Sequence, residues 1–545
     1  MSTNLADPPV EPSAAERGPT ASQSAATRGI ASAALIITAG NLLSRLFGLV
    51  REQLAAHYFG TGDAVAPFAL ADSMLTILYD LLISGMVAAA LVPVLSEYAA
   101  PERRAELRKI VGTLLTLALL VLGAVTILLI IFAPQLVTIW LRSGTGTIDE
   151  ALLPEAIRNV RLILPGVLLL GLSAILLATN YALGRFAWPS VAQAARNGAI
   201  IVAALLFVRT LGVTSLVVGV LAGGVLLVAL QLPGLRDALP VPGLALRHPA
   251  IRRIFRLYAP IFIGLIANTI GQLIDRNLAA GRAGDDALGA MRYATTLQQL
   301  VLGLVATGIA LGALPALSRQ AEAGDEESFR ATLTAALRMT TVLIVPASLG
   351  LLALATPIVN LLFRHGATGA AGASAIVLAL LWYIPGTFFQ AYDQLLINVF
   401  YARRNTLTPQ LVGVAAVALY IAVELALVGR YGMVALVGAI SVQWTFHAIV
   451  MYWLARRHLA PSDHRAFARV LGICLGVGII MAAVAWGATN VLSRTLPGPT
   501  LVREVLGIAI PVVLGVALYA WGITRLGIDD FAVLSRRVVA KVRRG

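Results

Sequence analysis

The sequence has little of the chemistry that soluble enzymes use. It contains one cysteine, Cys474, so no disulfide framework or thiol metal site can be built from it alone. Histidine is also scarce, with six residues, which gives poor support to catalytic metal chemistry. Charged residues make up 12% of the chain, against roughly 25% in a soluble domain. These shortages argue against a soluble globular protein.

Motifs of enzymes and cofactor sites are missing as well. The sequence has no Walker A motif, no HExxH and no GxSxG. We therefore expect no enzyme activity, no cofactor and no metal site. Without an ATP-binding module, transport would draw on an ion gradient, the membrane potential or the substrate gradient. The net charge of +14 does not indicate nucleic acid, because the basic residues lie mostly in loops and no basic–aromatic module is present.

What the sequence does have is long apolar runs. It is 59% hydrophobic, and its mean hydropathy is +0.85. Apolar stretches of about 20 residues or more recur along most of the chain, which is typical of transmembrane helices and not of barrel strands. The pattern predicts an all-α polytopic membrane protein with about 14 transmembrane helices. The expected spans lie near 30–58, 64–96, 109–141, 157–184, 189–210, 213–234, 251–281, 286–318, 330–362, 372–402, 407–429, 432–456, 467–491 and 503–525.

The loop charges predict an orientation. Basic segments follow the second, sixth, tenth, twelfth and last spans. By the positive-inside rule, the even-numbered loops and both termini are cytoplasmic, in a multi-pass protein of the cytoplasmic membrane. The first 28 residues are rich in Ala, Ser, Pro and Thr and lack the layout of a signal peptide, which favours a disordered tail. The basic segments are 101–109, 247–253, 401–406, 455–465 and 536–545.

The chain also repeats itself. LVREQLAA at 49–56 resembles LIDRNLAA at 273–280, and Pro165-Gly166 recurs as Pro385-Gly386, at offsets of 224 and 220 residues. Each repeat holds six spans, so both copies have the same orientation, as in transporters built from parallel repeats. The expected organisation is a disordered tail at 1–28, an N-lobe at 29–235 (helices 1–6), a C-lobe at 250–458 (helices 7–12), two extra helices at 466–525 and a basic tail at 526–545.

Charges within the spans concentrate in the first two helices of each repeat. A charge that faces lipid costs about 2.5–3.5 kcal/mol, so these residues should face a polar cavity or a partner charge. Because the guanidinium group pairs with phosphate through a planar fork, several arginines in a cleft favour a phosphate-bearing substrate. The candidate substrate-binding residues are Arg45, Arg51, Asn268, Asp275, Arg276 and Arg292. The candidate ion-binding or structural acids are Glu52, Asp72, Asp393 and Glu424.

A structural interpretation stands beside this one. The adjacent pairs Arg51–Glu52 and Asp275–Arg276 can be ion pairs that hold the bundle together. The lone acids of the later spans can bind a proton or a cation, or they can form helix–helix hydrogen bonds. The sequence leaves these alternatives open.

Several ordered motifs resemble the MurJ/MviN family of lipid II flippases. They lie at 44–52, 59–62, 92–98, 275–279, 288–294, 314–319 and 400–406. The resemblance implies a fourteen-helix member of the multidrug/oligosaccharidyl-lipid/polysaccharide exporter superfamily, with two lobes around a cationic cavity and two helices that form a groove for the lipid tail. It implies movement of lipid II from the inner to the outer leaflet, among membrane lipids, for the cell-wall synthesis machinery. Arg45 and Arg51 match family arginines, and this match implies binding of the pyrophosphate.

Four positions depart from the family pattern. Ala66 and Ser84 stand where the family has acids, and Tyr79 and Thr296 where it has arginines. Arg292 lies about one turn before Thr296, and residues four apart share a helix face. Two alternatives therefore stay open: a flippase for another polyprenyl-pyrophosphate-linked glycan, and a non-transporting scaffold of envelope assembly. A cation-coupled exporter would depend on the lone acids instead of the arginines.

Overall fold

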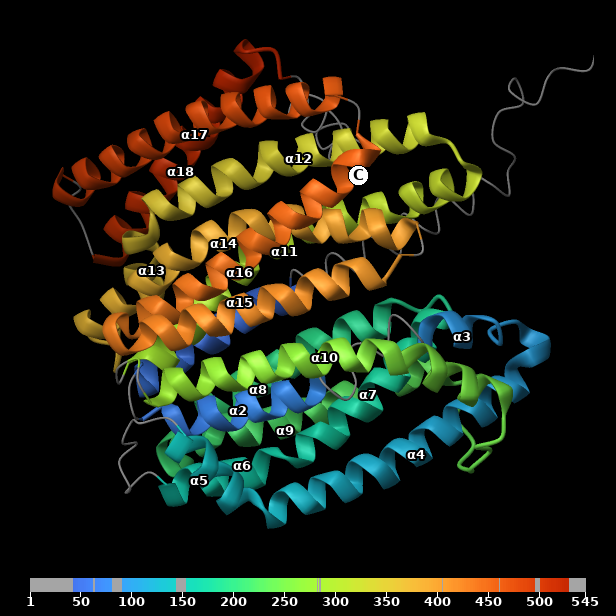
Figure 1. The fold of residues 1–545 in the computed structure, drawn as a ribbon. Coiled ribbons are helices and arrows are strands. Elements are labelled where there is room, and N and C mark those ends of the chain that lie inside the picture. Colours follow the sequence, from blue (N-terminus) through green and yellow to red (C-terminus); the bar gives the residue numbers. More distant parts are fainter. Residues whose placement is uncertain are drawn as a thin grey trace, which may run out of the picture.

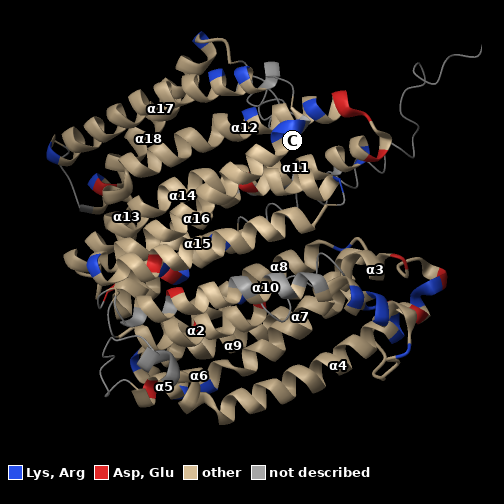
Figure 2. Cartoon of the chain, in the orientation of Figure 1, with Lys and Arg blue, Asp and Glu red and all other residues tan. Residues whose placement is uncertain are grey.

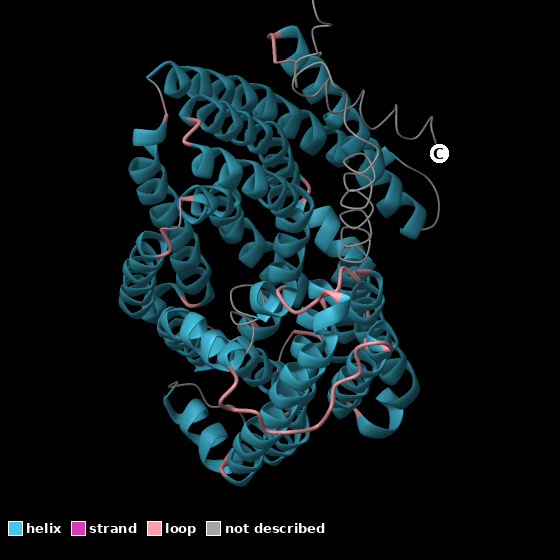
Figure 3. Ribbon diagram, turned by 90° about the vertical axis from the view of Figure 1, so that its right-hand side faces the viewer, coloured by secondary structure: helices cyan, strands magenta, loops and turns pink. Residues whose placement is uncertain are grey.

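The computed structural model describes most of the chain. It covers residues 43–61, 64–80, 91–143, 153–281, 283, 286–403, 405–459, 461–495 and 500–528. The described residues are almost entirely helical and contain no strand, as Figure 3 shows. The expected tail at 1–28, Ser84 and most of the expected basic tail lie outside these residues, as do the side chains of Asn268 and Arg276.

The helices follow one another closely along the chain (Figure 1). A first helix covers 43–59. The next are α2 (Ala66–Tyr79), α3 (Val92–Ser96), α4 (Arg104–Ile131), α5 (Ala133–Ser143), α6 (Leu153–Ile163), α7 (Pro165–Ala182), α8 (Ala187–Leu211) and α9 (Thr214–Ala229). After them come α10 (Pro249–Gly281), α11 (Ala287–Ala323), α12 (Glu326–Ala353), α13 (Ala355–Phe363), α14 (Ala370–Ala402), α15 (Leu407–Tyr431), α16 (Met433–Ala455), α17 (Pro461–Thr495) and α18 (Thr500–Arg525).

Length and composition make these helices membrane-spanning. Eleven of the described helical segments are long and apolar enough to cross a bilayer. In hydrocarbon each backbone N–H and C=O must find a partner within the protein, and a helix supplies these partners within one segment. The helices expose many large apolar side chains on α4, α8, α17 and α18, as expected of surfaces that face lipid. The predicted all-α polytopic fold is confirmed.

Three predicted spans are each divided into two helices. The predicted 109–141 is interrupted at Phe132, and the predicted 330–362 at Leu354. The predicted 157–184 divides at Leu164, directly before Pro165, which lacks a backbone N–H and begins α7. Pro385, by contrast, lies inside a continuous α14. Hydropathy alone does not register the breaks at Phe132 and Leu354, because both sides of each of these two breaks are apolar.

The predicted repeat is visible in the ends of equivalent helices. Gly212 caps the end of α8 with φ +55°, and Gly432 caps the end of α15 with φ +53°. The two glycines are 220 residues apart, the offset seen in the sequence. A positive φ is accessible to glycine without the clash that a Cβ brings, so both repeats turn into the next helix in the same way.

Figure 1 shows the helices in two groups, with α2–α9 in one and α11–α18 in the other. α10 contacts both groups. Near its start, Ile254 packs in a cluster with residues of α3, α4 and α7, whereas near its end the Gly271 carbonyl accepts a hydrogen bond from Tyr420 of α15 (2.6 Å). The groups lie close together on the left of Figure 1 and diverge on the right.

At one end the two groups are fastened together. We call this the closed end and define it as residues 53–61 with 286–293 and 362–372. The His57 carbonyl accepts from the Ala367 N–H (2.7 Å), and the Ala56 carbonyl accepts from the Thr368 hydroxyl (2.7 Å). The buried Tyr293 hydroxyl donates to the Gly60 carbonyl (2.9 Å). These bonds connect the first helix to α11 and to the loop between α13 and α14.

Charged residues gather mainly at the two ends of the helices, and the middle of the bundle is largely uncharged (Figure 2). A small charged group nevertheless lies inside, near α2. Because a buried charge is costly unless it is paired, this group is the place to look for a functional site.

Candidate functional site

The charged group is built around Glu52 of the first helix. Its side chain is 1% exposed and accepts hydrogen bonds from two arginines. Arg51 donates to Oε1 through Nε (3.1 Å) and Nη2 (2.5 Å). Arg292 of α11 donates through Nε to Oε2 (2.8 Å) and through Nη2 to Oε1 (3.0 Å). Glu52 thus connects the first helix of one repeat to the second helix of the other.

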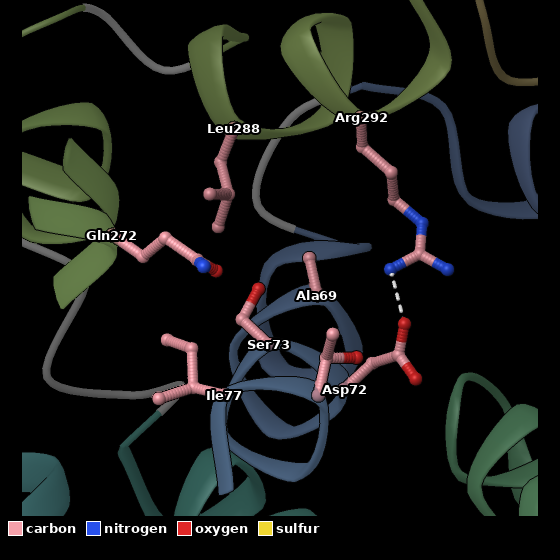
Figure 4. Close-up of a pocket in the computed structure, with 8 residues that line it drawn as sticks. Ala69, Asp72, Ser73, Ile77, Gln272, Leu288 and Arg292 are labelled. Atoms are coloured by element: carbon pink, nitrogen blue, oxygen red, sulfur yellow. Dashed lines mark hydrogen bonds and ion pairs between the residues drawn. The ribbon is translucent and has the colours of Figure 1, made fainter. Parts of the chain in front are cut away.

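Arg292 is held on three sides. Besides Glu52, it donates through Nη1 to Asp72 Oδ2 of α2 (2.8 Å), and its guanidinium lies 4.8 Å from the centre of the buried Phe68 ring. A pocket of about 90 Å³ opens beside the Asp72–Arg292 pair, as Figure 4 shows. Ser73 and Gln272 are polar residues of its lining. The pocket therefore offers hydrogen-bonding groups next to a buried ion pair.

A further arginine, which we did not single out in the sequence, joins the group from α8. Arg196 is largely buried, its Nε has no hydrogen-bond partner among the described residues, and it interacts electrostatically with Asp72 and Arg51. Gly223 of α9 makes room for it, since an added Cβ would lie 3.1 Å from Arg196 Cγ. The signal was present in the sequence, because Arg196 is a charge within an apolar span.

We call Arg51, Glu52, Asp72, Arg196 and Arg292 the arginine cluster. It combines three guanidinium groups with two carboxylates, so one formal positive charge is left uncompensated within it. Attraction between an anion and such a charge is strengthened where low-dielectric protein surrounds it. The arrangement can bind a phosphate group, and it has no nucleophile–base pair of the kind that covalent catalysis uses.

Neighbouring polar side chains orient Arg51. Its Nη1 donates to Asn197 Oδ1 (3.4 Å), and Asn197 in turn donates to the Ser44 carbonyl (3.0 Å). Arg45 does not pair with a carboxylate in the described structure. It donates to the backbone carbonyl of Gln299, and Gly303 of α11 leaves space for its guanidinium. The Arg45 guanidinium therefore lies at the junction between the first helix and α11, and no carboxylate of the described residues neutralises its charge.

The other candidate residues lie elsewhere. Asp275 of α10 and Glu424 of α15 are buried, and their two carboxyl groups interact electrostatically. Asp393 of α14 is paired with His447 of α16 at 2.5 Å. The structure thus separates the predicted residues into an arginine cluster and two sites that contain acids. No group of three or more His, Cys, Asp or Glu that could hold a metal occurs in the described part of the chain.

Positions that depart from the family pattern lie close to the cluster. Tyr79, where the resemblance led us to expect an arginine, is an electrostatic neighbour of Arg196. Thr296 donates a hydrogen bond to the Arg292 carbonyl (3.2 Å). Its side chain therefore does not take the place of the guanidinium expected at this position. Arg196 and Arg292 therefore bring cationic groups near two positions where the expected arginines are missing.

An apolar pocket of about 470 Å³ begins at the helix that carries the arginines. Leu49, two residues before Arg51, lines it together with residues of α11, α12, α17 and α18. Among them are Pro346, Met481 and Tyr519. We call this pocket the apolar groove. Its apolar lining can accommodate a hydrocarbon chain.

The fold and the site together define a polytopic helical membrane transporter with a cationic interior site and an apolar groove that the same first helix lines. A family model described as "Lipid II flippase MurJ" matches residues 55–506. The chain therefore belongs to the MurJ family of lipid II flippases, which are transporters and not enzymes.

Named relatives agree with this assignment. The lipid II flippase MurJ of Burkholderia cenocepacia is 28% identical over 475 residues, covering 84% of this chain and 90% of its own. The probable lipid II flippase MurJ of Haemophilus influenzae is 28% identical and covers 82% of this chain and 89% of its own.

Solved structures share the fold. A lipid II flippase MurJ in an inward closed conformation matches with a TM-score of 0.74 at 20% identity, over 93% of this chain and 100% of that one. An inward-facing multidrug resistance transporter of the MATE family matches with a TM-score of 0.66 at 14% identity, over 80% and 98%. These matches show that the chain shares its fold with both structures.

Proposed function

We propose that this chain moves lipid II from the inner to the outer leaflet of the cytoplasmic membrane by alternating access, for use by the cell-wall synthesis machinery. The observation that carries the proposal is the arginine cluster. It keeps an uncompensated positive charge inside an apolar bundle, where an unpaired charge is costly. A pyrophosphate is the part of lipid II that such a charge can bind.

The two ends of the substrate correspond to the two parts of the site. The pyrophosphate would contact Arg51 and Arg196, whose donors are less fully used by carboxylates than those of Arg292. The lipid tail would lie in the apolar groove, which begins at Leu49 on the same helix as Arg51. The first helix thus contributes to both parts, which supports a lipid-linked anion over a free anion.

The closed end fits one side of an alternating-access cycle. We propose that the closed end faces the outer side, that the basic loops and both termini are cytoplasmic, and that the lobes 29–235 and 250–458 rock about the arginine cluster. The inter-helix bonds at His57, Ala56 and Gly60 would have to break for release outward. We also propose the Asp275–Glu424 pair as the site of a coupling ion, because adjacent buried acids retain a proton or a cation between them.

The test is complementation with a leaflet readout. A host depleted of its own flippase expresses the parent chain, Arg51→Ala, Arg196→Ala, or the control Arg330→Ala, which removes an exposed arginine of α12. The parent and the control should restore lipid II to the outer leaflet, and the two cluster variants should not, at equal expression.

Failure of a well-inserted parent would redirect the proposal to another polyprenyl-pyrophosphate-linked glycan or to a scaffold role. Full rescue by both cluster variants would remove the arginine cluster from the mechanism.

A further inference from the structure

A second polar site lies within the other repeat, away from the residues proposed to bind lipid II. A pocket of about 180 Å³ opens between α14, α15 and α16. Asp393 and His447 line it, and both side chains are buried. The rest of its lining is mostly apolar, except for Tyr401, Gln410, Gln443 and the polar edge of Trp444.

The hydrogen bonds of His447 favour a fully protonated ring. Its Nδ1 lies 2.5 Å from Asp393 Oδ1, and its Nε2 lies 3.3 Å from the Pro409 carbonyl oxygen. The Pro409 carbonyl oxygen is an acceptor, and so is Oδ1 when Asp393 is ionised. A neutral imidazole carries one N–H and would turn a lone pair toward one of them, whereas the imidazolium donates to both. In that form His447 of α16 is bonded to α14 and to α15 at once.

Asp393 has capacity that the protein does not use. Its side chain is 0% exposed, and Oδ2 has no hydrogen-bond partner among the described residues. A buried carboxylate oxygen without a donor is costly. The pocket beside it has room for several waters at about 30 Å³ each, which can donate to Oδ2 and carry a proton.

Asp393 and His447 are the charged pair of this pocket. Asp393 and His447 are each other's charge partners, and Tyr401 of α14 is a further titratable group that interacts with Asp393. α15 contributes Pro409 and Gln410 and α16 contributes Gln443 besides His447, so neither helix adds another charged side chain to the described lining.

We propose that Asp393 and His447 form a proton-binding site that links α14, α15 and α16 when it is occupied. When the site empties, His447 gives the proton on Nε2 to water in the pocket, and the site becomes more negative by one charge. The bond to Pro409 is then lost, while the bond to Asp393 remains. α15 thereby loses this hydrogen bond to α16. Proton occupancy of the site therefore biases how the helices of the second repeat pack.

The experiment follows the histidine rings directly. The full-length chain, labelled with ¹⁵N-histidine and placed in lipid nanodiscs, has six histidines, and His447→Gln identifies the signal of interest. We expect the His447 ring to change protonation within the range of about pH 5 to 9 that histidines sample. In Asp393→Asn its midpoint should move by about one pH unit or more, because the neighbouring charge is gone.

Two controls separate a proton site from a structural contact. His464, which hydrogen-bonds with the Tyr452 hydroxyl (2.8 Å), serves as the internal reference, and its ring signals should be the same in parent and variant. Should Asp393→Asn fail to fold, Asp393→Glu keeps the charge and should keep a titrating His447.

Three results would overturn the proposal. They are a His447 ring that does not titrate in the parent, an unchanged midpoint in folded Asp393→Asn, and a midpoint that follows Na⁺ concentration at constant ionic strength. The last result would indicate a metal-cation site. None of these readouts depends on lipid II.

Discussion

At the scale of single residues, Glu52 organises the interior. An isolated carboxylate is expensive in an apolar bundle, but two guanidinium groups surround this one. Glu52 has both a structural and a functional consequence, because it holds Arg292 in place and also reduces the positive charge available to an anion. The structural interpretation of Arg51–Glu52 and the binding interpretation are therefore compatible.

Replacing Glu52 tests this arrangement. Glu52→Gln removes the charge that Arg51 and Arg292 share, and we expect the free energy of unfolding to fall by about 3–5 kcal/mol. The control is Glu106→Gln, which breaks an exposed pair with Arg103 and should cost about 0–1 kcal/mol. Unfolding in detergent, followed by circular dichroism in denaturant, measures both. Equal losses in the two variants would contradict the assigned role of Glu52.

At the scale of helices, close approach at the closed end depends on glycine. Gly289 of α11 lies against the Thr61 backbone, where an added Cβ would overlap the Thr61 carbonyl. Gly60, with φ +69°, turns the chain there, and a Cβ would lie 2.9 Å from the Ala367 carbonyl oxygen. Small residues thus allow the two repeats to meet through backbone hydrogen bonds.

Gly289→Ala should loosen the closed end. Alanine ordinarily stabilises a helix interior by about 0.5–1 kcal/mol over glycine, so loosening would show that the clash with Thr61 prevails. Pulsed EPR between spin labels at positions 58 and 364, in a Cys474→Ala background, should show a longer distance. Gly308→Ala, on the same helix with open space around the new Cβ, should leave the distance unchanged. An unchanged distance in Gly289→Ala would refute the prediction.

The start of α12 should respond to acid. The Ser328 backbone N–H donates to Asp325 Oδ1 (3.0 Å), and this bond lowers the pKa of Asp325 below its ordinary 3.8. Because its pKa is lowered on folding, ionised Asp325 stabilises the cap at pH values above its ordinary pKa. This stabilisation is lost as the pH falls through the folded-state pKa. Amide exchange in 326–330 should therefore rise in acid relative to Asp325→Asn at the same pH, since asparagine caps without titrating. If the ratio of the exchange rates in the parent and in Asp325→Asn stayed constant as the pH falls, this cap effect would be excluded.

At the scale of the whole molecule, the charged site and the apolar groove share the first helix, which carries Arg51 and Glu52 and lines the groove through Leu49. Helices from distant parts of the sequence line the groove, including the first helix, α12 and α18. A substrate with an anionic head and a long apolar tail can use both at once. The two helices that follow the two repeats, α17 and α18, both line the groove.

Filling the groove should impair transport of the tailed substrate. Gly350 lines the groove, and a Cβ there would lie 3.8 Å from Met481 Cε, so Gly350→Ala is tolerated and serves as the control. Gly350→Trp should lower lipid II translocation in proteoliposomes by about tenfold or more, equivalent to about 1.4 kcal/mol. An analogue with a truncated tail should be affected much less. Equal inhibition of both substrates would argue against tail binding in the groove.

The sequence predicted much of this arrangement and missed part of the site. Arg51 and Arg292 were identified as charges at membrane depth, and the structure brings them together through Glu52. Arg196 and His447 also lie in apolar spans but were not singled out, because their importance depends on which residues face them. Partners on other helices cannot be read from the spacing along one helix.

The sequence by itself determined the all-α polytopic class, the repeat and the family, because hydropathy, repeated motifs and motif order are properties of the linear chain. Only the tertiary structure decided which charges meet. Glu52 and Arg292 are 240 residues apart in the sequence. The other two contacting pairs, Asp275 with Glu424 and Asp393 with His447, have different separations. No single offset identifies such pairs, since each contact arises from how two helices cross. That packing divides the charged residues into an arginine cluster, an acid pair and an acid–histidine site.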